Sequence, residues 1–181
     1  MENKLFELAA KRRSVRRYAG GRISDETIRE IMKVALAAPC SFGHRPVEFI
    51  VVRNKDRIKE LAACKSLGGS QIIGADAVAV VMVKLERGEF WIEDGAIASS
   101  YILLAAEQYD LGACWYTFVI GQESTDPLMK KSVSCLMCRM DMLYSTLLLL
   151  AVKAKRNAGT RKLIWIKVKC ILKSSEVNSE R

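Results

Sequence analysis

Six basic residues lie around Ser14 near the start of the chain, in the stretch KRRSVRRYAGGRIS at residues 11–24. The basic residues are Lys11, Arg12, Arg13, Arg16, Arg17 and Arg22. Guanidinium groups and a serine hydroxyl donate charge-assisted hydrogen bonds to phosphate oxygens, so this pattern suits a phosphate. The same charges could instead bind nucleic acid or the surface of an acidic membrane.

The distribution of charge along the chain separates these partners. The formal net charge is +9 over 181 residues, with 17 Lys and Arg against 15 Asp and Glu in residues 1–115 and 12 against 5 in residues 116–181. The arginine cluster therefore lies in a nearly balanced part of the chain, which favours one specific anion over a long polyanion. No interleaving of aromatic residues and no second basic stripe accompany it in this part of the chain, and we expect no nucleic-acid partner.

Several common chemical motifs are absent from the sequence. It contains neither GxGxxG after an expected strand nor GxxxxGK[ST], so a dinucleotide-binding fingerprint and a P-loop are both excluded. His44 is the only histidine, which excludes a His-rich metal site. Cys135 and Cys138 form a single CxxC, which is a weak signal for zinc or redox chemistry. We expect no metal and no catalytic side chain, and the chemistry must come from a bound group.

Helical and strand patterns are mixed around these residues. Ser24 is expected to cap a helix that ends before Pro39, because Asp25 and Glu26 follow it and apolar residues then recur at helical spacing. The other expected helices are 2–11, 56–63 and 94–110, and the expected strands are 49–52, 77–83 and one that begins at 111–115. This mixture around a buried sheet predicts one α+β or layered α/β domain over residues 1–181.

We expect the chain to be soluble and cytoplasmic, without a membrane partner. Its longest apolar runs, at 145–152 and 77–83, are far shorter than the roughly 20 residues of a membrane span, and no signal peptide opens it. Six cysteines without a secretory signal are expected to be reduced thiols.

Three stretches in the first part of the chain resemble the signatures of the nitroreductase-like FMN-dependent oxidoreductases. They are RRSVRRY at 12–18, ALAAPCSFGHRPVEFIVV at 35–52 and FWIEDGAIASSYILLAAEQYDLGACW at 90–115. The resemblance covers nearly all of residues 3–115. In that family the first motif binds the FMN phosphate and ribityl chain, and the matching residues here are Arg12, Arg13, Ser14 and Arg16. The resemblance thus implies one phosphate as the ligand of the arginine cluster.

The resemblance implies a second group of cofactor-binding residues in the loop after the second helix. In the family this loop reaches the flavin that is bound mainly by the partner subunit. The matching residues are Pro39, Cys40, Ser41 and Gly43. Gln71, beside Ser70, lies near the place where the family often has an Asn or Gln on the flavin ring. Asp94 is interpreted as a charge that stabilises the N-terminus of the long helix.

Some loop positions depart from the family pattern. The family commonly has Ser at Cys40, Asn at Gly43, Gln at Arg45 and an aromatic residue at Val47. Loss of the Asn side chain would remove one hydrogen bond to the cofactor. We therefore expect the pocket to be altered rather than absent.

The resemblance also implies an architecture and an activity. The fold would be α+β, a three-layer α/β/α sandwich with a central, mostly antiparallel sheet. The protein would be a homodimer with FMN at the subunit interface. It would transfer electrons from NAD(P)H through the flavin to a nitroaromatic, a quinone or a related small acceptor.

The resemblance stops after Trp115, where methionine and cysteine become frequent. One missing G after the Trp115 codon would convert W-V-H-I-R-N-R into the observed sequence. The same shift lets residues 130–142 become the family-like E-E-V-R-E-L-L-D-V-P-x-G-Y. Residues 116–181 are therefore interpreted as a divergent or frameshifted tail. Lys155 and Arg156 stand near the family's C-terminal phosphate-binding residues, but a shifted frame would make this fortuitous.

A frameshifted tail would have consequences for the fold and the function. Residues 116–181 would not have been selected to pack on the domain, and the last strand of the family would be missing. Apolar surface would then be exposed, and we predict poor solubility. The alternative function is a non-catalytic or inactive product that binds flavin weakly or not at all. A nucleic-acid binder driven by the basic tail is a third hypothesis, and it would show steeply salt-dependent binding.

Overall fold

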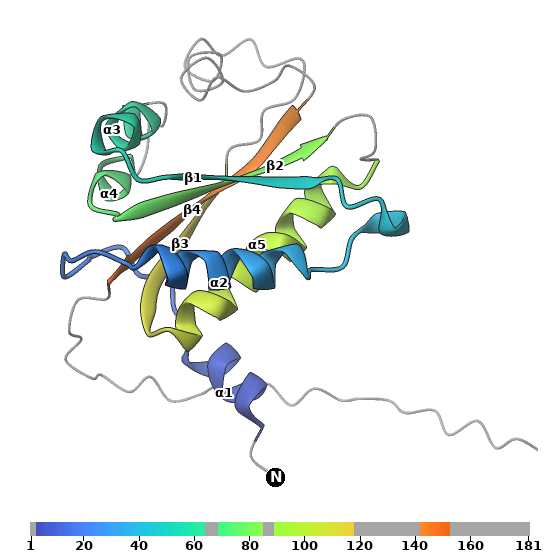
Figure 1. The fold of residues 1–181 in the computed structure, drawn as a ribbon, viewed down its shortest axis with the longest axis horizontal. Coiled ribbons are helices and arrows are strands. Elements are labelled where there is room, and N and C mark those ends of the chain that lie inside the picture. The colour runs from blue at the N-terminus through green and yellow to red at the C-terminus, as the bar shows by residue number, and fades with distance from the viewer. Residues whose placement is uncertain (1–2, 64–68, 85–88, 118–141, 153–181) are drawn as a thin grey trace, which may run out of the picture.

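The computed structural model describes residues 3–63, 69–84, 89–117 and, for the backbone, 142–152 (Figure 1). The helices are α1 (Lys4–Lys11), α2 (Asp25–Leu36), the short 3-10 helix η1 (Ser41–Gly43), α3 (Lys55–Ala63), α4 (Ser70–Ile73) and α5 (Trp91–Gln108). The strands are β1 (Val47–Val52), β2 (Ala77–Lys84), β3 (Leu111–Thr117) and β4 (Met142–Val152).

The four strands form one sheet in the order β1-β2-β4-β3, and every neighbouring pair is antiparallel. Val47 pairs with Val83 at one end of the β1–β2 ladder. Strand β4 pairs with β2 on one side and with β3 on the other, and it therefore lies inside the sheet. Strand β3 is an edge strand of the sheet that the structure describes.

Strand β2 is buried on both faces, and its alternating side chains define the two layers of the core. Val78, Val80 and Met82 pack with residues of α3 and α4. Ala77, Ala79 and Val81 pack with residues of α2 and α5. Figure 1 shows these two pairs of helices on opposite sides of the sheet. The expected three-layer α+β fold with an antiparallel central sheet is confirmed.

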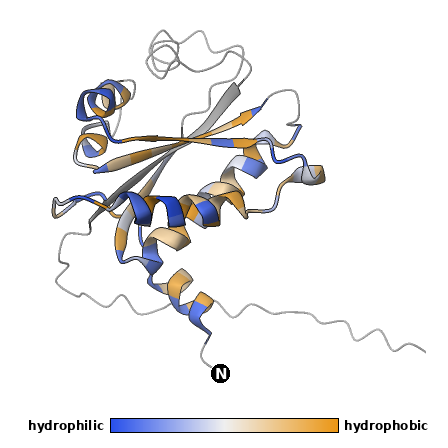
Figure 2. Cartoon of the chain, in the orientation of Figure 1, coloured by the Kyte–Doolittle hydropathy of each residue, from blue (hydrophilic) through white to orange (hydrophobic). Residues whose placement is uncertain are grey.

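Helix α2 begins as its sequence predicts. Ser24 is the N-cap, and its Oγ accepts a hydrogen bond from the backbone N–H of Thr27 at 3.0 Å. Ile28, Ile31 and Ala35 are buried on one side of the helix. The outer part of α2 is hydrophilic, whereas much of β2 is hydrophobic (Figure 2). The helix is therefore amphipathic and packs its apolar side against α5.

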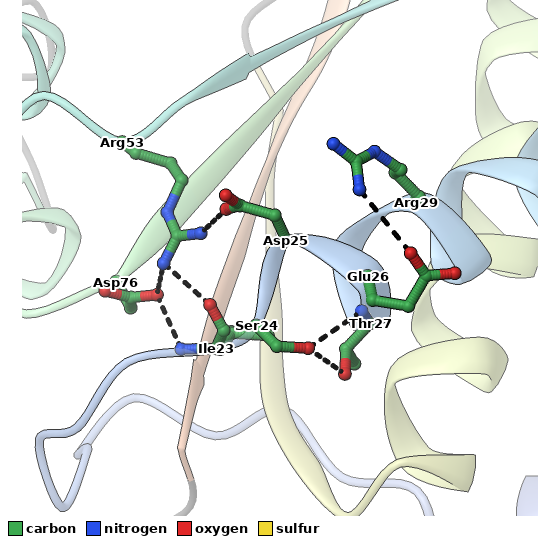
Figure 3. A network of polar contacts seen from close by, with 8 residues as sticks. All are labelled: Ile23, Ser24, Asp25, Glu26, Thr27, Arg29, Arg53 and Asp76. Carbon is green, nitrogen blue, oxygen red and sulfur yellow. Dashed lines mark hydrogen bonds and ion pairs between the residues drawn. The ribbon is translucent and has the colours of Figure 1, made fainter.

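A polar network fixes the start of α2 to the sheet (Figure 3). Arg53, just after β1, pairs with Asp25 and with Asp76, whose Oδ2 lies 2.7 Å from Arg53 Nη2. The same Nη2 donates to the carbonyl of Ile23 at 2.7 Å, and the Ile23 N–H donates to Asp76 Oδ2 at 2.9 Å. This network joins the segment that follows the arginine cluster to the end of β1 and the start of β2.

The position of β4 corrects one expectation about the tail. Residues 116–181 were expected to lack the last strand, and this is wrong for Met142–Val152, whose backbone pairs with both β2 and β3. The segment contains the apolar run at 145–152, and a continuous apolar run of this length is typical of a strand inside a sheet. The frameshift interpretation and the single-domain boundaries remain predictions. In the part of the chain described above, no helix combines the length and apolar character of a membrane span.

Candidate functional site

The basic segment after α1 lies along the edge of the sheet. Val15 donates its backbone N–H to the carbonyl of Ala113 in β3 at 2.9 Å, and Ser14 forms a parallel bridge with Ala113. Val15 is buried, whereas Ser14 and Arg16 are exposed. In an extended chain, side chains at alternate positions point to the same side, and Arg12, Ser14 and Arg16 occupy alternate positions. That these three residues converge on one anion stays a prediction.

Arg13, the fourth of these residues, has a local structural contact. Its Nη1 donates to the carbonyl oxygens of Ala10 and Arg12, at 2.6 and 2.7 Å. These acceptors lie at the C-terminus of α1, where backbone carbonyls lack partners within the helix. Arg13 thus closes the end of α1. The phosphate-binding role that the resemblance implies for it stays a prediction.

Tyr116 brings two of the predicted cofactor-binding residues together. Its hydroxyl donates to Oε1 of Gln71 in α4, and the Arg16 guanidinium lies beside the same phenol. Burial raises the pKa of Tyr116 to about 12; the neighbouring Cys114 thiol adds to the rise and Arg16 opposes it. Tyr116 was missed in the sequence because it follows the break at Trp115. Tyr116 lies in β3 two residues after Cys114, and both side chains are buried. The strand expected to begin at 111–115 was therefore the sequence feature that could have pointed to it.

The loop of residues 39–45, between α2 and β1, adopts an unusual backbone conformation. Phe42, Gly43 and Arg45 have positive φ angles of 52°, 70° and 48°. The Arg45 N–H donates to Cys40 Sγ at 3.1 Å, across the turn. Glycine adopts positive φ without strain, whereas Phe and Arg rarely do. Contacts from outside the loop must therefore hold this conformation.

Asp94 provides such a contact, and the sequence did not predict it. Its Oδ1 accepts the backbone N–H of Ser41 at 2.8 Å and the Ser41 hydroxyl at 2.9 Å. Asp94 is only 1% exposed, and its Oδ2 is buried without a hydrogen-bond partner among the described residues. Helix α5 begins at Trp91, so Asp94 lies inside the first turn. The contact joins residues far apart in the chain, and no local signal could have found it.

A pocket of about 220 Å³ opens beside the same loop. Its wall includes Pro39, Cys40 and Arg45 from the loop and Val47 and Phe49 from β1. The valine fills less of this space than the aromatic residue that is common at its position in the family. The altered cofactor pocket expected from the sequence stays a prediction.

The two predicted groups of cofactor-binding residues lie at opposite ends of α5. Lys11, next to the basic segment, pairs with Glu107 near the end of the helix at 3.6 Å. Ser41, in the loop, is bound to Asp94 in the first turn. The helix between Asp94 and Glu107 is about 20 Å long at 1.5 Å per residue. Within one chain, the loop and the basic segment are therefore well separated (Figure 1).

Some sequence-based candidates lie outside the described residues. These are Cys135 and Cys138 of the CxxC, and the basic pair Lys155 and Arg156. Within residues 3–63, 69–84 and 89–117, no group of three His, Cys, Asp or Glu side chains could hold a metal ion.

A family model and two related proteins all identify similarity to nitroreductases. Residues 9–92 match the model of the nitroreductase family. A protein of Methanothermobacter thermautotrophicus named "Putative NADH dehydrogenase/NAD(P)H nitroreductase" is 34% identical over 61% of this chain and 59% of its own length. A protein of the same name from Archaeoglobus fulgidus is 36% identical over 58% of this chain and 62% of its own length. The matched part thus spans about three fifths of these relatives.

The fold has a solved counterpart. The structure of an FMN-dependent nitroreductase from Clostridium difficile R20291 superposes with a TM-score of 0.78 at 29% identity. The superposition covers 87% of this chain and 92% of that protein.

Proposed function

The chain belongs to a nitroreductase-like family, and from this premise we propose that it is an oxidoreductase that uses bound FMN. Electrons would pass from NAD(P)H, by way of the flavin, to a nitroaromatic, a quinone or a related small acceptor. FMN, when bound, supplies this redox chemistry, and the protein supplies binding and position. No side chain need act as a catalyst.

The position of the basic segment beside β3 carries this proposal. The backbone of this segment is tied to β3 at Ser14 and Val15, and Arg12, Ser14 and Arg16 would share one side of it because they occupy alternate positions. Two guanidinium groups and a hydroxyl on one side fit a single dianionic phosphate, which they would bind by charge-assisted hydrogen bonds. The buried Val15 fixes which side of the segment faces outward. The residues present therefore fit the phosphate end of FMN.

Gln71 is proposed to bind the ring end of the cofactor. Its Oε1 accepts from Tyr116, which leaves the amide nitrogen to donate to a ligand. Within the described residues, no acceptor takes a hydrogen bond from this nitrogen. Arg16 lies beside the same tyrosine, so the proposed phosphate and ring contacts come from one neighbourhood.

A homodimer is proposed because one chain separates the loop from the basic segment by most of α5. The cofactor-binding roles proposed for Pro39, Cys40 and Gly43 would then serve the flavin of the partner. Exposed hydrophobic side chains on this side of the molecule support association, since Leu36 is 60% and Phe42 76% exposed. We also propose that the protein is cytoplasmic and binds no nucleic acid.

The experiment is a reduction assay on the full chain. The chain is loaded with FMN, freed of excess cofactor and mixed without oxygen with NADH or NADPH, and the visible flavin absorbance is recorded. We expect the absorbance to fall on reduction and to recover when a quinone or nitroaromatic is added. Arg16→Ala should lose the flavin, whereas Arg17→Ala, an equal change of charge outside the proposed phosphate face, should keep it.

The sharp change in composition after Trp115 favours one alternative, a non-catalytic product with little or no flavin affinity. A chain that stays colourless after loading would support this alternative and contradict the proposed activity. Binding to single-stranded nucleic acid that falls steeply with salt would instead favour the basic tail as the functional element.

A further inference from the structure

We propose that Asp94 is a positioning residue, whose buried carboxylate holds the loop of residues 39–45 in the conformation that binds FMN. The loop part of this inference rests on the geometry alone, and the cofactor part rests on the proposed function. Asp94 itself contacts no cofactor in this account. It acts through Ser41.

The contact between Asp94 and Ser41 is short, double and shielded from water. One carboxylate oxygen accepts both the backbone N–H and the hydroxyl of Ser41, at 2.8 and 2.9 Å. Asp94 is 1% exposed. Hydrogen bonds to a charged acceptor are stronger than neutral ones, and water competes little at a buried site. Among the described residues, Asp94 is the side chain from a distant part of the chain that forms hydrogen bonds with this loop.

The loop requires an anchor because its own backbone is unfavourable. Phe42 and Arg45 both have positive φ without being glycine, and the Phe42 side chain is 76% exposed. Phe42 has tilted ring contacts with His44 and Phe90, with centroids 5.9 and 6.0 Å apart, but it gains little from burial that could hold its conformation. The backbone–backbone hydrogen bonds within the loop, such as Gly43 N–H to the Cys40 carbonyl, are long at 3.3 Å. The strong contact at Ser41 is therefore the natural origin of its order.

The same contact changes the role proposed for Ser41. Both donors of Ser41, its N–H and its hydroxyl, point to Asp94 and cannot donate to a cofactor at the same time. Ser41 would therefore support the loop, and the direct contacts fall to its neighbours Cys40 and Gly43. This differs from a direct cofactor-binding role for Ser41, which the resemblance implied.

An alternative role for Asp94 is electrostatic stabilisation of the α5 N-terminus. Two variants separate the roles. Asp94→Asn removes the charge but keeps an oxygen acceptor at the same place. Glu93→Ala removes the charge of the exposed neighbour in the same first turn and leaves the loop contact untouched.

The test combines hydrogen exchange of the loop amides with FMN titration of the full chain. We expect the Ser41 amide to exchange slowly in three proteins: the wild type, Asp94→Asn and Glu93→Ala. Their FMN affinities should lie within roughly three-fold of each other. In Asp94→Ala, the Ser41 amide should exchange rapidly, and FMN affinity should fall by roughly ten-fold or more, as for one lost charge-assisted hydrogen bond. Adding Ser41→Ala to Asp94→Ala should have little further effect.

Rapid exchange of the Ser41 amide in the wild type, or unchanged FMN affinity in Asp94→Ala, would overturn the proposal. Equal losses in Asp94→Asn, Glu93→Ala and Asp94→Ala would support the electrostatic role instead. If the wild type binds no FMN, the proposed function fails with the cofactor part, while the exchange pattern still decides the loop part. If Asp94→Ala does not fold, Ser41→Ala, which removes one of the two bonds, should loosen the loop and weaken FMN a few-fold.

Discussion

Replacement of Arg53 by alanine should destabilise the fold more than the loss of a solvent-exposed ion pair would. The Arg53 side chain is 20% exposed and the Asp76 side chain 15%, whereas Asp25 is 61% exposed. The exposed pair with Asp25 contributes about 0–1 kcal/mol. The shielded hydrogen bond to Asp76 contributes roughly 1.5–3 kcal/mol, because its loss leaves a half-buried carboxylate with the Ile23 N–H as its remaining partner. We expect a loss of about 2–3 kcal/mol in the free energy of unfolding.

Chemical denaturation of the full chain measures this loss, with a fall in Tm of roughly 5–10 °C as a second readout. Lys59→Ala is the control, because Lys59 forms an exposed pair with Asp56 on α3 and should cost at most about 0.5 kcal/mol. Arg53→Lys keeps the charge without the forked geometry and should fall between the two. If Arg53→Ala costs no more than Lys59→Ala, the network in Figure 3 does not fix the start of α2.

Three further predictions follow from the structure. Arg16→Ala should weaken FMN binding by roughly ten-fold or more, and Arg13→Ala by only a few-fold, because Arg13 Nη1 is occupied by the α1 carbonyls; equal losses in a titration would contradict this difference. The folded state favours the neutral Tyr116 phenol, since its pKa is raised from 10.0 to about 12. This stabilisation is complete below pH 10 and is lost as the pH rises through about 12, so Tyr116→Phe should show a smaller alkaline loss of stability, and an unchanged profile would refute the shift. Ile31→Ala, at a fully buried site of α2, should cost about 2–5 kcal/mol, whereas Val34→Ala, which is 41% exposed, should cost less than about 1 kcal/mol in the same denaturation assay.

The parts of the fold that depend on local chemistry could be predicted from the sequence. The cap at Ser24 and the spacing of Ile28 and Ile31 define α2 without reference to other elements. The apolar run of β2 likewise indicates burial on both faces, and the structure places helices on both. Helix α5 was predicted to begin at Asp94 but begins at Trp91, because nothing in the sequence marked the added first turn.

Contacts between distant residues could not be predicted in this way. Strand β4 was missed because the composition of the tail hid a run whose partners, β2 and β3, are specified only by the sheet. The bond between Ser41 and Asp94 joins a loop to a helix, and the sequence had assigned each residue a different role, cofactor binding for Ser41 and stabilisation of the helix N-terminus for Asp94. The distance between the loop and the basic segment could likewise not be predicted, because it depends on how α5 packs between them.

The most direct test of the account is the visible absorption spectrum of the purified full chain after incubation with FMN and removal of the excess. We expect flavin bands to remain with the wild type and with Arg17→Ala, and to be lost with Arg12→Ala and Arg16→Ala. A folded wild-type chain that stays colourless would contradict the claim that the basic segment beside β3 is an FMN phosphate site.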